Sequence, residues 1–271
     1  MIAVCPNPYR DIDLQITDKV CKMLAEEGFD TVVCQIFSDS EPSLHSVEDR
    51  ISLAIVIGGD GTILSAAREL FGTEVPILGV NLGTKGFMAS LEPNEIHYII
   101  DAAKGNFERT ERMMLDAKLY REGELVYSGC CLNDAVIHGY GDTINISAYT
   151  DNSVIITFSG DGIILSTPTG STGYSMSAGG PIVEPEAKAI IISPICAHSL
   201  GARSYVIGHD RSVSVITEKL HDRKAYLSID GNSVADLVNG DKLIVSESCN
   251  KVIMANVGNK SFFETAFKKL M

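Results

Sequence analysis

The chain has 271 residues, of which 45% are hydrophobic and 21% charged, and its formal net charge is −13 at pH 7. This length predicts two ordinary domains, and the aliphatic content excludes an intrinsically disordered chain. The acidic charge and the lack of a basic run exclude non-specific binding to nucleic acid, which depends on clustered Lys and Arg.

The first part of the chain alternates strand and helix patterns. Short apolar runs predict strands at 2–5, 31–37, 53–57 and 77–80. Apolar residues at helical spacing predict helices at 11–27, 63–71 and 93–103. Alternation of this kind is typical of a Rossmann-like parallel sheet whose faces are covered by helices. We therefore expect an α/β N-terminal domain over residues 1–111.

After about Arg112 the pattern becomes β-branched and alternating. Strands are predicted at 117–120, 125–128, 135–138, 144–149, 154–158, 189–192, 212–217, 225–229, 242–246 and 252–255. Residues 112–255 are therefore expected to form a β-rich, sandwich-like C-terminal domain. Residues 256–271 are expected to be a tail, helical from Phe262, that packs back on the N-terminal domain.

The first motif with chemical content is the GGDGT turn, which follows the strand at 53–57 and opens a helix. Its glycines let backbone N–H groups approach phosphate oxygens at the positive end of the helix, which makes Gly58, Gly59, Gly61 and Thr62 candidate phosphate-binding residues. A carboxylate beside a phosphate is unfavourable, so Asp60 suggests a metal contact or a catalytic base. The alternative is a tight turn with an aspartate cap.

Two common nucleotide signatures do not occur in the chain. The P-loop pattern G-x-x-x-x-G-K-[ST] has no match, and the dinucleotide pattern G-x-G-x-x-G fails because Leu64 stands where its third glycine belongs. A P-loop NTPase and a dehydrogenase are therefore disfavoured.

A second motif spans residues 160–181, where a short strand leads into a segment rich in Ser, Thr and Gly and then into a short helix. Hydroxyls can pair with base edges, and Tyr174 offers an aromatic face. Taken alone, the segment is interpreted more readily as caps and turns.

A third motif is the neighbouring pair Asn133 and Asp134, at the start of an apolar strand. Adjacent strand residues point to opposite faces, so a bulge or a strand end must turn both toward one ligand. Otherwise one of them serves as a turn cap.

The seven cysteines never form a C-x-x-C pair, which argues against a disulfide framework and a zinc knuckle. The N-terminus lacks a signal-peptide pattern, and no apolar run reaches membrane-spanning length. A soluble, cytoplasmic protein without a membrane partner is expected.

Together the motifs resemble those of the NAD kinase family. They are GGDGT at 58–62, GVNLGTKGF at 79–87, LNDAVIH at 132–138, the segment at 160–181 and the SFFETAFKKL tail. The resemblance implies a kinase that transfers a phosphoryl group from ATP, another triphosphate or polyphosphate to the 2′-hydroxyl of the adenosine ribose of NAD. It also implies that NAD lies between the two domains and that the enzyme is a homodimer or homotetramer.

The resemblance assigns Asp60 as the proton acceptor. It implies NAD contacts at Asp60, Gly61, Phe87, Asn133, Asp134, Asp161, Thr169, Thr172, Gly173, Tyr174, Ser175, Ser177 and Asn232. A divalent ion, Mg²⁺ by preference, is expected to arrive with the donor phosphates rather than to occupy a fixed protein site. The chain departs from the family pattern at Asp134, where a glutamate is usual. Lys85 is as readily a solvated loop charge as a phosphate contact.

Two alternatives share part of this pattern. A diacylglycerol- or sphingosine-type lipid kinase also carries a GGDGT turn but needs an apolar acyl pocket or a membrane-facing surface, and the sequence shows neither plainly. A non-catalytic NAD sensor would keep the segment at 169–177 and leave Asp60 without a chemical task.

Overall fold

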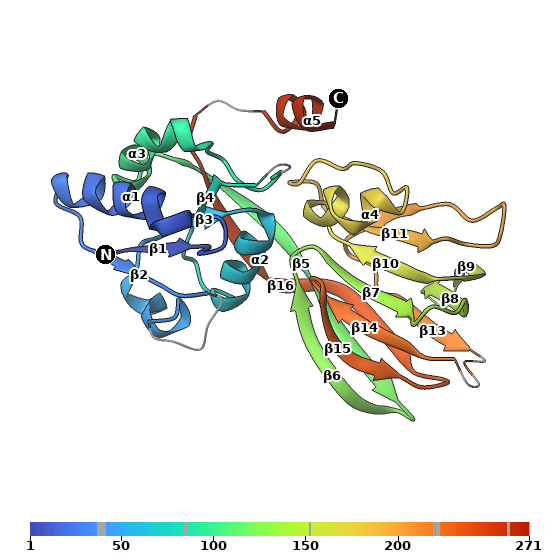
Figure 1. Cartoon of the computed structure of the whole chain (residues 1–271). Helices are drawn as coiled ribbons and strands as arrows, with labels where there is room; N and C mark the ends of the chain where they lie inside the picture. Colours follow the sequence, from blue (N-terminus) through green and yellow to red (C-terminus); the bar gives the residue numbers. More distant parts are fainter. Residues whose placement is uncertain are drawn as a thin grey trace. The chain divides into compact units, whose positions relative to one another are not determined.

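The chain forms two compact units, shown in the computed structural model of Figure 1. The structure describes residues 1–36, 42–83, 86–151, 153–218, 220, 223–258 and 261–270. The first unit comprises Met1–Arg112 and Lys251–Met271, and the second comprises Met113–Asn250. Residues 251–255, which the sequence pattern assigned to the β-rich domain, therefore fall in the first unit.

The first unit is built on a parallel sheet with the strand order β2-β1-β3-β4. Its strands are β1 (Ile2–Pro6), β2 (Thr31–Val33), β3 (Leu53–Gly58) and β4 (Ile77–Asn81). Every residue of β1, β3 and β4 is buried, as expected for a parallel sheet with both faces covered. The end of β16 (Lys242–Asn256) joins this sheet in parallel through Met254, which pairs with Ile77 of β4.

The carboxyl ends of β3 and β4 lie side by side, because Gly58 pairs with Asn81. The turn after β3 and the loop after β4 therefore emerge at the same edge of the sheet. Ligands of parallel α/β sheets bind at such carboxyl ends. This register explains how the GGDGT turn meets the loop that contains Phe87.

The helices of the first unit differ in detail from the predicted ranges. They are α1 (Gln15–Glu26), α2 (Asp60–Glu69), α3 (Ile99–Ala103) and α5 (Phe262–Leu270), with 3-10 turns at Ile12–Leu14, His45–Arg50 and Pro93–Tyr98. The helix predicted at 11–27 is interrupted because Asp13 and Leu14 have positive φ angles. The Asp11 carboxylate then accepts the N–H groups of Ile16 and Thr17 at 2.9 Å each and so caps α1.

The second unit is a sandwich of two sheets, which confirms the predicted fold class. In one sheet, β8 (Ile144–Thr150) lies between β9 (Ser153–Gly160) and β13 (Val213–Glu218), and β13 pairs with β16. A hairpin of β5 (Glu108–Arg121) and β6 (Glu124–Cys131) belongs to the same sheet.

The other sheet is antiparallel in the order β12-β11-β10-β7-β14-β15. Its strands are β7 (Asp134–Gly139), β10 (Gly162–Ser166), β11 (Ala189–Ile195), β12 (Tyr205–Gly208), β14 (Ala225–Ile229) and β15 (Asn232–Leu237). The two sheets of this unit share one hydrophobic core. It is formed by alternate residues of each sheet, such as Ile137 and Leu165 of this sheet and Ile146 and Val215 of the sheet that contains β8 and β13. The opposite face carries α4 (Tyr174–Ser177), which follows a 3-10 turn at Thr169–Thr172.

The strands differ from the predicted ones in several places, and β5 begins at Glu108 rather than at 117. The strands β12 and β15 are largely exposed and lack a clear alternation of apolar residues, so the sequence pattern passed over them. The strands predicted at 242–246 and 252–255 are one long strand, β16. The strand predicted at 31–37 ends at Val33, and its last predicted residue, Phe37, lies outside the described residues.

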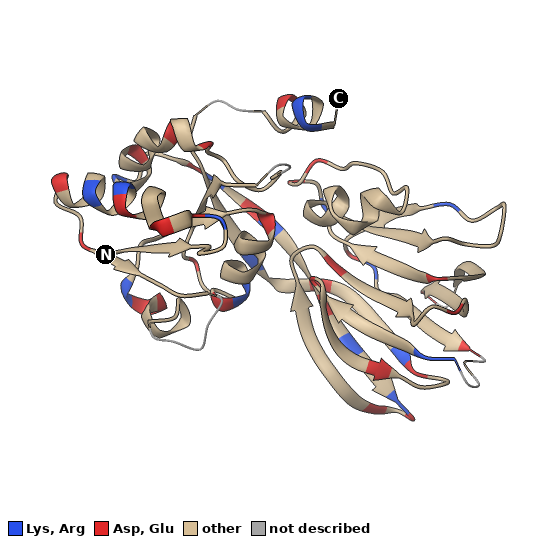
Figure 2. Ribbon diagram, viewed as in Figure 1, with Lys and Arg blue, Asp and Glu red and all other residues tan. Residues whose placement is uncertain are grey.

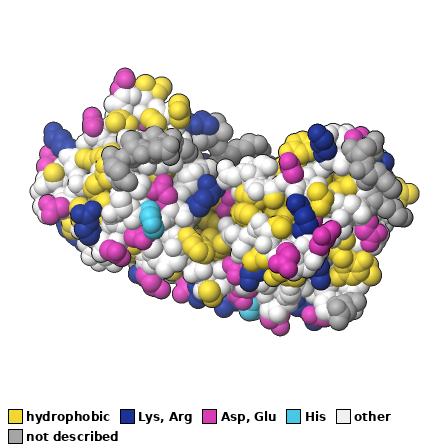
Figure 3. Space-filling view, turned by 90° about the horizontal axis from the view of Figure 1, so that it is seen from below, with side chains coloured by type: hydrophobic (Ala, Val, Ile, Leu, Met, Phe, Trp, Pro, Cys, Tyr) yellow, Lys and Arg dark blue, Asp and Glu magenta, His cyan; other side chains and the backbone are white. Residues whose placement is uncertain are grey.

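Charged side chains of both signs are spread over the described surface. Figure 2 shows acidic and basic residues interspersed along helices and exposed strands, and the view in Figure 3 shows hydrophobic side chains scattered among them. Single exposed hydrophobic residues of this kind are ordinary. Among the described residues, no helix combines the length and the apolar character needed to cross a membrane.

Candidate functional site

Asp60 is the first residue of α2, where unpaired backbone N–H groups and the helix dipole create positive potential. Its carboxylate is fixed from outside the helix: Oδ2 accepts the N–H of Phe87 at 2.8 Å, and Oδ1 accepts the N–H of Met88 at 3.1 Å. Burial raises the pKa of Asp60, and the two N–H groups and Lys269 oppose that rise. A carboxylate with a fixed orientation and a raised pKa is suited to accept a proton.

The glycines around Asp60 keep the turn tight on one side and open on the other. A Cβ atom at Gly58 would lie 2.3 Å from Thr62 Oγ1, and one at Gly86 would lie 2.7 Å from Asn81 Oδ1. Cβ atoms at Gly59 and Gly61 would meet nothing within 4 Å. The backbone at these two positions is therefore accessible to a ligand.

Thr62, a predicted phosphate-binding residue, has a buried side chain in the structure. Its hydroxyl accepts a hydrogen bond from Asn7 Nδ2 at 3.0 Å, and its N–H bonds to the Gly59 carbonyl at 2.9 Å. This arrangement ties the turn to the end of β1. The side chain of Thr62 supports the turn, and the open backbone of its neighbours remains the surface for phosphate.

A lysine that the sequence interpretation did not single out also reaches this turn. Lys269 of α5 donates a hydrogen bond to the carbonyl of Gly86 and lies 3.7 Å from Glu92 Oε1. Gly86 directly precedes Phe87, so α5 braces the loop that orients Asp60. A lysine near the end of an amphipathic tail has the pattern of a surface charge, and no local signal marks this role. Lys85 lies outside the described residues.

In the second unit, Asn133 and Asp134 lie at a strand end rather than within a strand. β6 ends at Cys131 and β7 begins at Asp134. A Cβ atom at Gly173 would lie 3.5 Å from Asn133 Nδ2 and 4.0 Å from Asp134 Oδ2. The strand end therefore turns the amide and the carboxylate toward the same glycine. Both side chains can then face one ligand, as the sequence analysis requires of a shared site.

Two buried polar atoms beside this strand end have no hydrogen-bond partner among the described residues. They are Asn133 Oδ1 and Thr169 Oγ1. Buried polar atoms are nearly always paired, because leaving one unpaired costs about 1–3 kcal/mol. The two atoms are suited to receive polar groups of a ligand.

Other hydroxyls of the Ser/Thr-rich segment are engaged within the protein. Thr167 Oγ1 donates to the carbonyl of Leu132 at 2.6 Å and accepts the N–H of Gly170 at 3.0 Å, which ties the segment to the Asn133–Asp134 strand end. The hydroxyl of Ser175, a predicted NAD contact, is fully buried and pairs with that of Ser193 of β11 at 2.9 Å. Its side chain fixes α4 to the sheet.

The other predicted residues of this segment present more surface. Thr172 and Gly173 are half-buried, and Tyr174 and Ser177 are exposed. The Thr172 hydroxyl donates to the Thr169 carbonyl at 3.3 Å. These four residues remain accessible to a ligand of the second unit.

Aromatic rings extend the exposed face beside α4. The ring of His138 of β7 is stacked 6.5 Å from that of Tyr174 and 5.9 Å from that of Tyr226, and Tyr140 lies 4.7 Å beyond Tyr226. Of these rings, only that of Tyr174 was predicted from the sequence as a ligand contact. His138 lies in β7, Tyr140 directly follows that strand and Tyr226 lies in β14, so only the folded sheet aligns the three rings.

Two further predicted residues lie elsewhere in the second unit, Asp161 between β9 and β10 and Asn232 at the start of β15. A hydrogen bond between the Cys196 thiol and the Asp161 carboxylate raises the pKa of Cys196. Asn232 is exposed at the start of β15, and its Nδ2 donates to the carbonyls of Ile229 and Asp230 at 3.4 Å each. Among the described residues, neither side chain hydrogen-bonds to Asn133 or Asp134.

The environment of Asp134 favours its neutral form. Burial raises its pKa to about 7, and the negative charge of Asp230 contributes to the rise. Asp230 is a second residue that the sequence interpretation missed, and its carboxylate accepts backbone N–H groups of this strand end.

The stability of the protein should depend on pH through Asp134. The folded protein keeps the carboxyl proton of Asp134 up to about pH 7, whereas the unfolded chain, in which this aspartate has its ordinary pKa of 3.8, releases the proton at much lower pH. Between these values the folded state binds more protons, so this group makes stability fall as the pH rises. Asp134→Asn lacks this titrating group and should not lose this stability. When the buffer changes from mildly acidic to mildly alkaline, we expect the unfolding free energy of Asp134→Asn to increase relative to that of wild type by more than about 1 kcal/mol.

Urea unfolding at both pH values measures this difference. The exposed Asp142 provides a matched control, because Asp142→Asn removes one charge from the same unit. A parallel pH dependence in wild type and Asp134→Asn would contradict the assignment of the raised pKa to Asp134.

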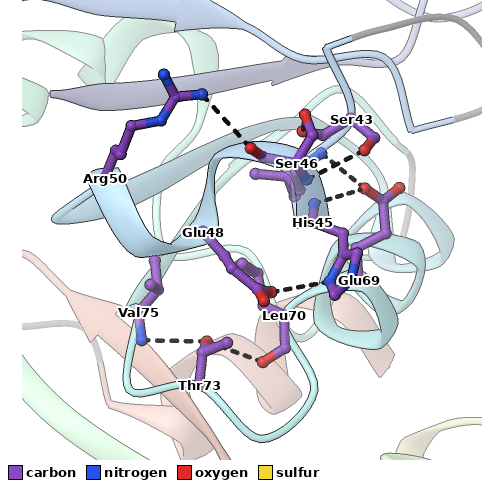
Figure 4. Close-up of polar contacts among 10 residues, drawn as sticks. Ser43, His45, Ser46, Glu48, Arg50, Glu69, Leu70, Thr73 and Val75 are labelled. Carbon is purple, nitrogen blue, oxygen red and sulfur yellow. Dashed lines mark hydrogen bonds and ion pairs between the residues drawn. The ribbon is translucent and has the colours of Figure 1, made fainter.

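A cavity of about 520 Å³ lies elsewhere in the first unit, at the amino ends of β3 and β4. Polar groups beside it bond to one another, as Figure 4 shows: Glu69 accepts the N–H of His45 at 3.4 Å, and the Thr73 hydroxyl donates to the carbonyl of Leu70 at 2.9 Å. His45 and Glu48 form a further pair at 3.0 Å. The bonds to Glu69 hold the start of the 3-10 turn at 45–50 against the end of α2.

Known protein families and relatives match both parts of the chain. Residues 2–104 match the ATP-NAD kinase N-terminal domain, and residues 132–257 match the ATP-NAD kinase C-terminal domain. An NAD kinase of Lachnoclostridium phytofermentans is 36% identical over 270 residues, covering 96% of this chain and 95% of the relative. An NAD kinase of Ruminiclostridium cellulolyticum is 33% identical over 277 residues, covering 99% of this chain and 97% of the relative.

Solved structures show the same fold. Yeast NADH kinase complexed with NADH has a TM-score of 0.86 at 22% identity, covering 99% of this chain and 86% of that chain. An Archaeoglobus fulgidus NAD kinase in complex with ATP has a TM-score of 0.77 at 25% identity, covering 100% of this chain and 98% of that chain. The chain belongs to the ATP-NAD kinase family.

Proposed function

We propose that this protein phosphorylates the 2′-hydroxyl of the adenosine ribose of NAD and so produces NADP. The observation that carries the proposal is Asp60, a buried carboxylate that two backbone N–H groups fix at the start of a helix beside an open glycine backbone. A phosphate site that contains a proton acceptor fits phosphoryl transfer to a hydroxyl. Family membership supports NAD as the acceptor.

In this proposal Asp60 accepts the proton of the attacking ribose hydroxyl. Its raised pKa brings its basicity closer to neutral pH, where a general base is most effective. The N–H groups of Phe87 and Met88 keep the carboxylate from rotating. The backbone of Gly59 and Gly61 at the start of α2 binds donor phosphates.

The second unit contributes the NAD-binding groups. The Asn133 amide and the Asp134 carboxylate hold a ribose through its hydroxyls, and the unpaired oxygens of Asn133 and Thr169 supply further polar contacts. Tyr174 and its aromatic neighbours offer a face for a planar ring. Most of the rate enhancement then comes from positioning the two substrates.

The phosphoryl donor is ATP, another nucleoside triphosphate or polyphosphate, and it is accompanied by Mg²⁺. Among the described residues, no group of three or more His, Cys, Asp or Glu side chains could hold a metal ion. We assign the ion to the donor phosphates, where it would neutralise charge during transfer. The steps assigned above to protein groups do not depend on a fixed metal site.

We further propose a cytoplasmic homodimer or homotetramer. All seven cysteines lie in the described part of the chain and are free thiols, as is usual in a reducing compartment. Phe263 and Phe267 of α5 are 64% and 70% exposed, and aromatic residues one helical turn apart are suited to contact another copy of the chain.

The proposed function is tested by incubating the purified protein with NAD, ATP and Mg²⁺ and detecting NADP with an NADP-specific dehydrogenase. Steady NADP formation that needs all three components is expected. Diacylglycerol and sphingosine as acceptors are the controls for a lipid kinase. NAD binding without NADP formation from any donor would favour a sensor and refute the proposal.

A further inference from the structure

Asp230 lies in the turn between β14 and β15 and holds the Asn133–Asp134 strand end. Its Oδ1 accepts the N–H groups of Asn133 at 2.7 Å and Asp134 at 3.1 Å, and its Oδ2 accepts the N–H of Leu132 at 2.9 Å. In return, the N–H of Asp230 donates to the carbonyl of Asp134 at 3.0 Å. One residue thus engages the backbone of three consecutive residues on a neighbouring chain segment.

The backbone of the turn allows this side chain to face the strand end. Asp230 has φ 46° and Gly231 has φ 80°, the left-handed conformation typical of tight hairpins. Aspartate and asparagine tolerate this conformation better than most residues other than glycine. The N–H groups of residues 132–134 would otherwise need another acceptor, because β6 has ended and β7 is only beginning there.

We propose that Asp230 is a positioning residue for NAD, which acts by setting the orientation of the Asn133 amide and the Asp134 carboxylate. This inference rests on the proposed function, in which those two side chains hold a ribose. Asp230 does not touch NAD in this account. Its effect passes through the backbone of residues 132–134.

Asp230 also acts on Asp134 through its charge. A carboxylate that accepts several N–H groups is held in its charged form, and that charge adds to burial in raising the pKa of Asp134 to about 7. The other ionisable groups facing Asp134 are Cys131 at the end of β6 and Tyr174 of α4. The pKa values of both are raised, so both are neutral near pH 7 and leave Asp230 as the charged neighbour among the described residues.

The effect of the Asp230 charge on Asp134 can be measured through the pH dependence of NAD binding, which a merely structural residue would not change. If the charged form of Asp134 accepts a hydrogen bond from a ribose hydroxyl, NAD binding strengthens as the pH rises through about 7. Removing the charge of Asp230 lowers the pKa of Asp134 and moves this transition to lower pH.

The test measures the Kd of NAD by titration calorimetry, from about pH 6 to about pH 8, for wild type, Asp230→Asn and Asp142→Asn. Asn keeps one acceptor oxygen and the left-handed backbone but removes the charge. We expect Asp230→Asn to weaken binding at its best pH by about tenfold and to move the midpoint down by about one pH unit. The control Asp142→Asn is expected to match wild type.

A double variant separates orientation from charge. In an Asp134→Asn background, Asp230→Asn should still weaken binding but should no longer move the pH midpoint. If Asp230→Asn does not fold by circular dichroism, Asp230→Glu carries the test, because it keeps the charge and shifts the carboxylate by one methylene. That variant is expected to keep the wild-type midpoint and to bind NAD more weakly.

The inference is overturned if the variant that carries the test binds NAD as wild type does, or if folded Asp230→Asn keeps the wild-type pH midpoint. Failure of wild type to bind NAD at any pH is a different result. It would refute the proposed function itself, and the inference with it.

Discussion

Asp60→Asn is expected to lower kcat by about 10²–10⁴-fold, the usual contribution of general acid–base catalysis. The amide has nearly the shape of the carboxylate but cannot accept the proton of the ribose hydroxyl. KM values for NAD and ATP should change little, because the glycine backbone and the groups of the second unit remain. Steady-state kinetics of NADP formation measure all three quantities.

The control for this prediction is Asp101→Asn, which removes an exposed carboxylate from α3 in the same unit. Only one of the two N–H bonds to residue 60 can persist in Asp60→Asn, so a thermal unfolding curve must accompany the kinetics. A folded Asp60→Asn protein with wild-type turnover would remove Asp60 from the mechanism.

Gly170→Ala is expected to produce the second-largest effect. A Cβ atom at this position would lie 2.2 Å from the carbonyl oxygen of Asn133 and 2.8 Å from its Cα. Backbone atoms cannot move aside as a flexible side chain would, so the Asn133–Asp134 strand end must shift. We expect an unfolding free energy lower by about 1–3 kcal/mol and a KM for NAD raised about tenfold or more.

The matched control is Gly201→Ala in the same unit, where the nearest atom to a Cβ is Ser199 Oγ at 3.9 Å. It should leave the KM for NAD within about twofold of wild type. If Gly170→Ala had the stability and the KM of the control, the segment at 169–177 would not set the position of Asn133.

The sequence predicted the elements whose signal is local. The apolar strand at 53–57 followed by GGDGT shows a strand, a turn and a helix in one short window, and the structure has β3 and α2 there. The change from alternating helices and strands to β-branched runs predicted the two kinds of architecture. The family resemblance drew on the same short motifs and led to the family that the comparisons show.

The residues that the sequence did not reveal act across long separations. Asp230 bonds to a segment 96–98 residues away, and Lys269 bonds to a carbonyl 183 residues away. An Asp-Gly turn is interpreted from sequence as a hairpin and nothing more. Which backbone groups its carboxylate meets depends on the strand order, which places β14 beside β7.

Hydroxyl-rich segments pose a different difficulty. The family resemblance implied NAD contacts in the segment at 169–177, yet Ser175 bonds to Ser193, and Ser171 donates to the carbonyl of Val183 at 3.1 Å. Thr169 Oγ1 has no partner among the described residues. Composition cannot distinguish hydroxyls that fix the loop from those that face a ligand, because the distinction arises only when the segment packs on β10 and β11.

The position of the transferred phosphate tests the central claim most directly. NAD, ATP and Mg²⁺ are incubated with the purified protein, and the dinucleotide product is isolated and examined by proton–phosphorus correlation NMR. The account predicts one new phosphorus signal that correlates with the 2′ proton of the adenosine ribose, absent when Asp60→Asn replaces wild type over the same time. A phosphate on the 3′-hydroxyl or on the nicotinamide ribose, or unmodified NAD with ATP consumed on another acceptor, would contradict the account.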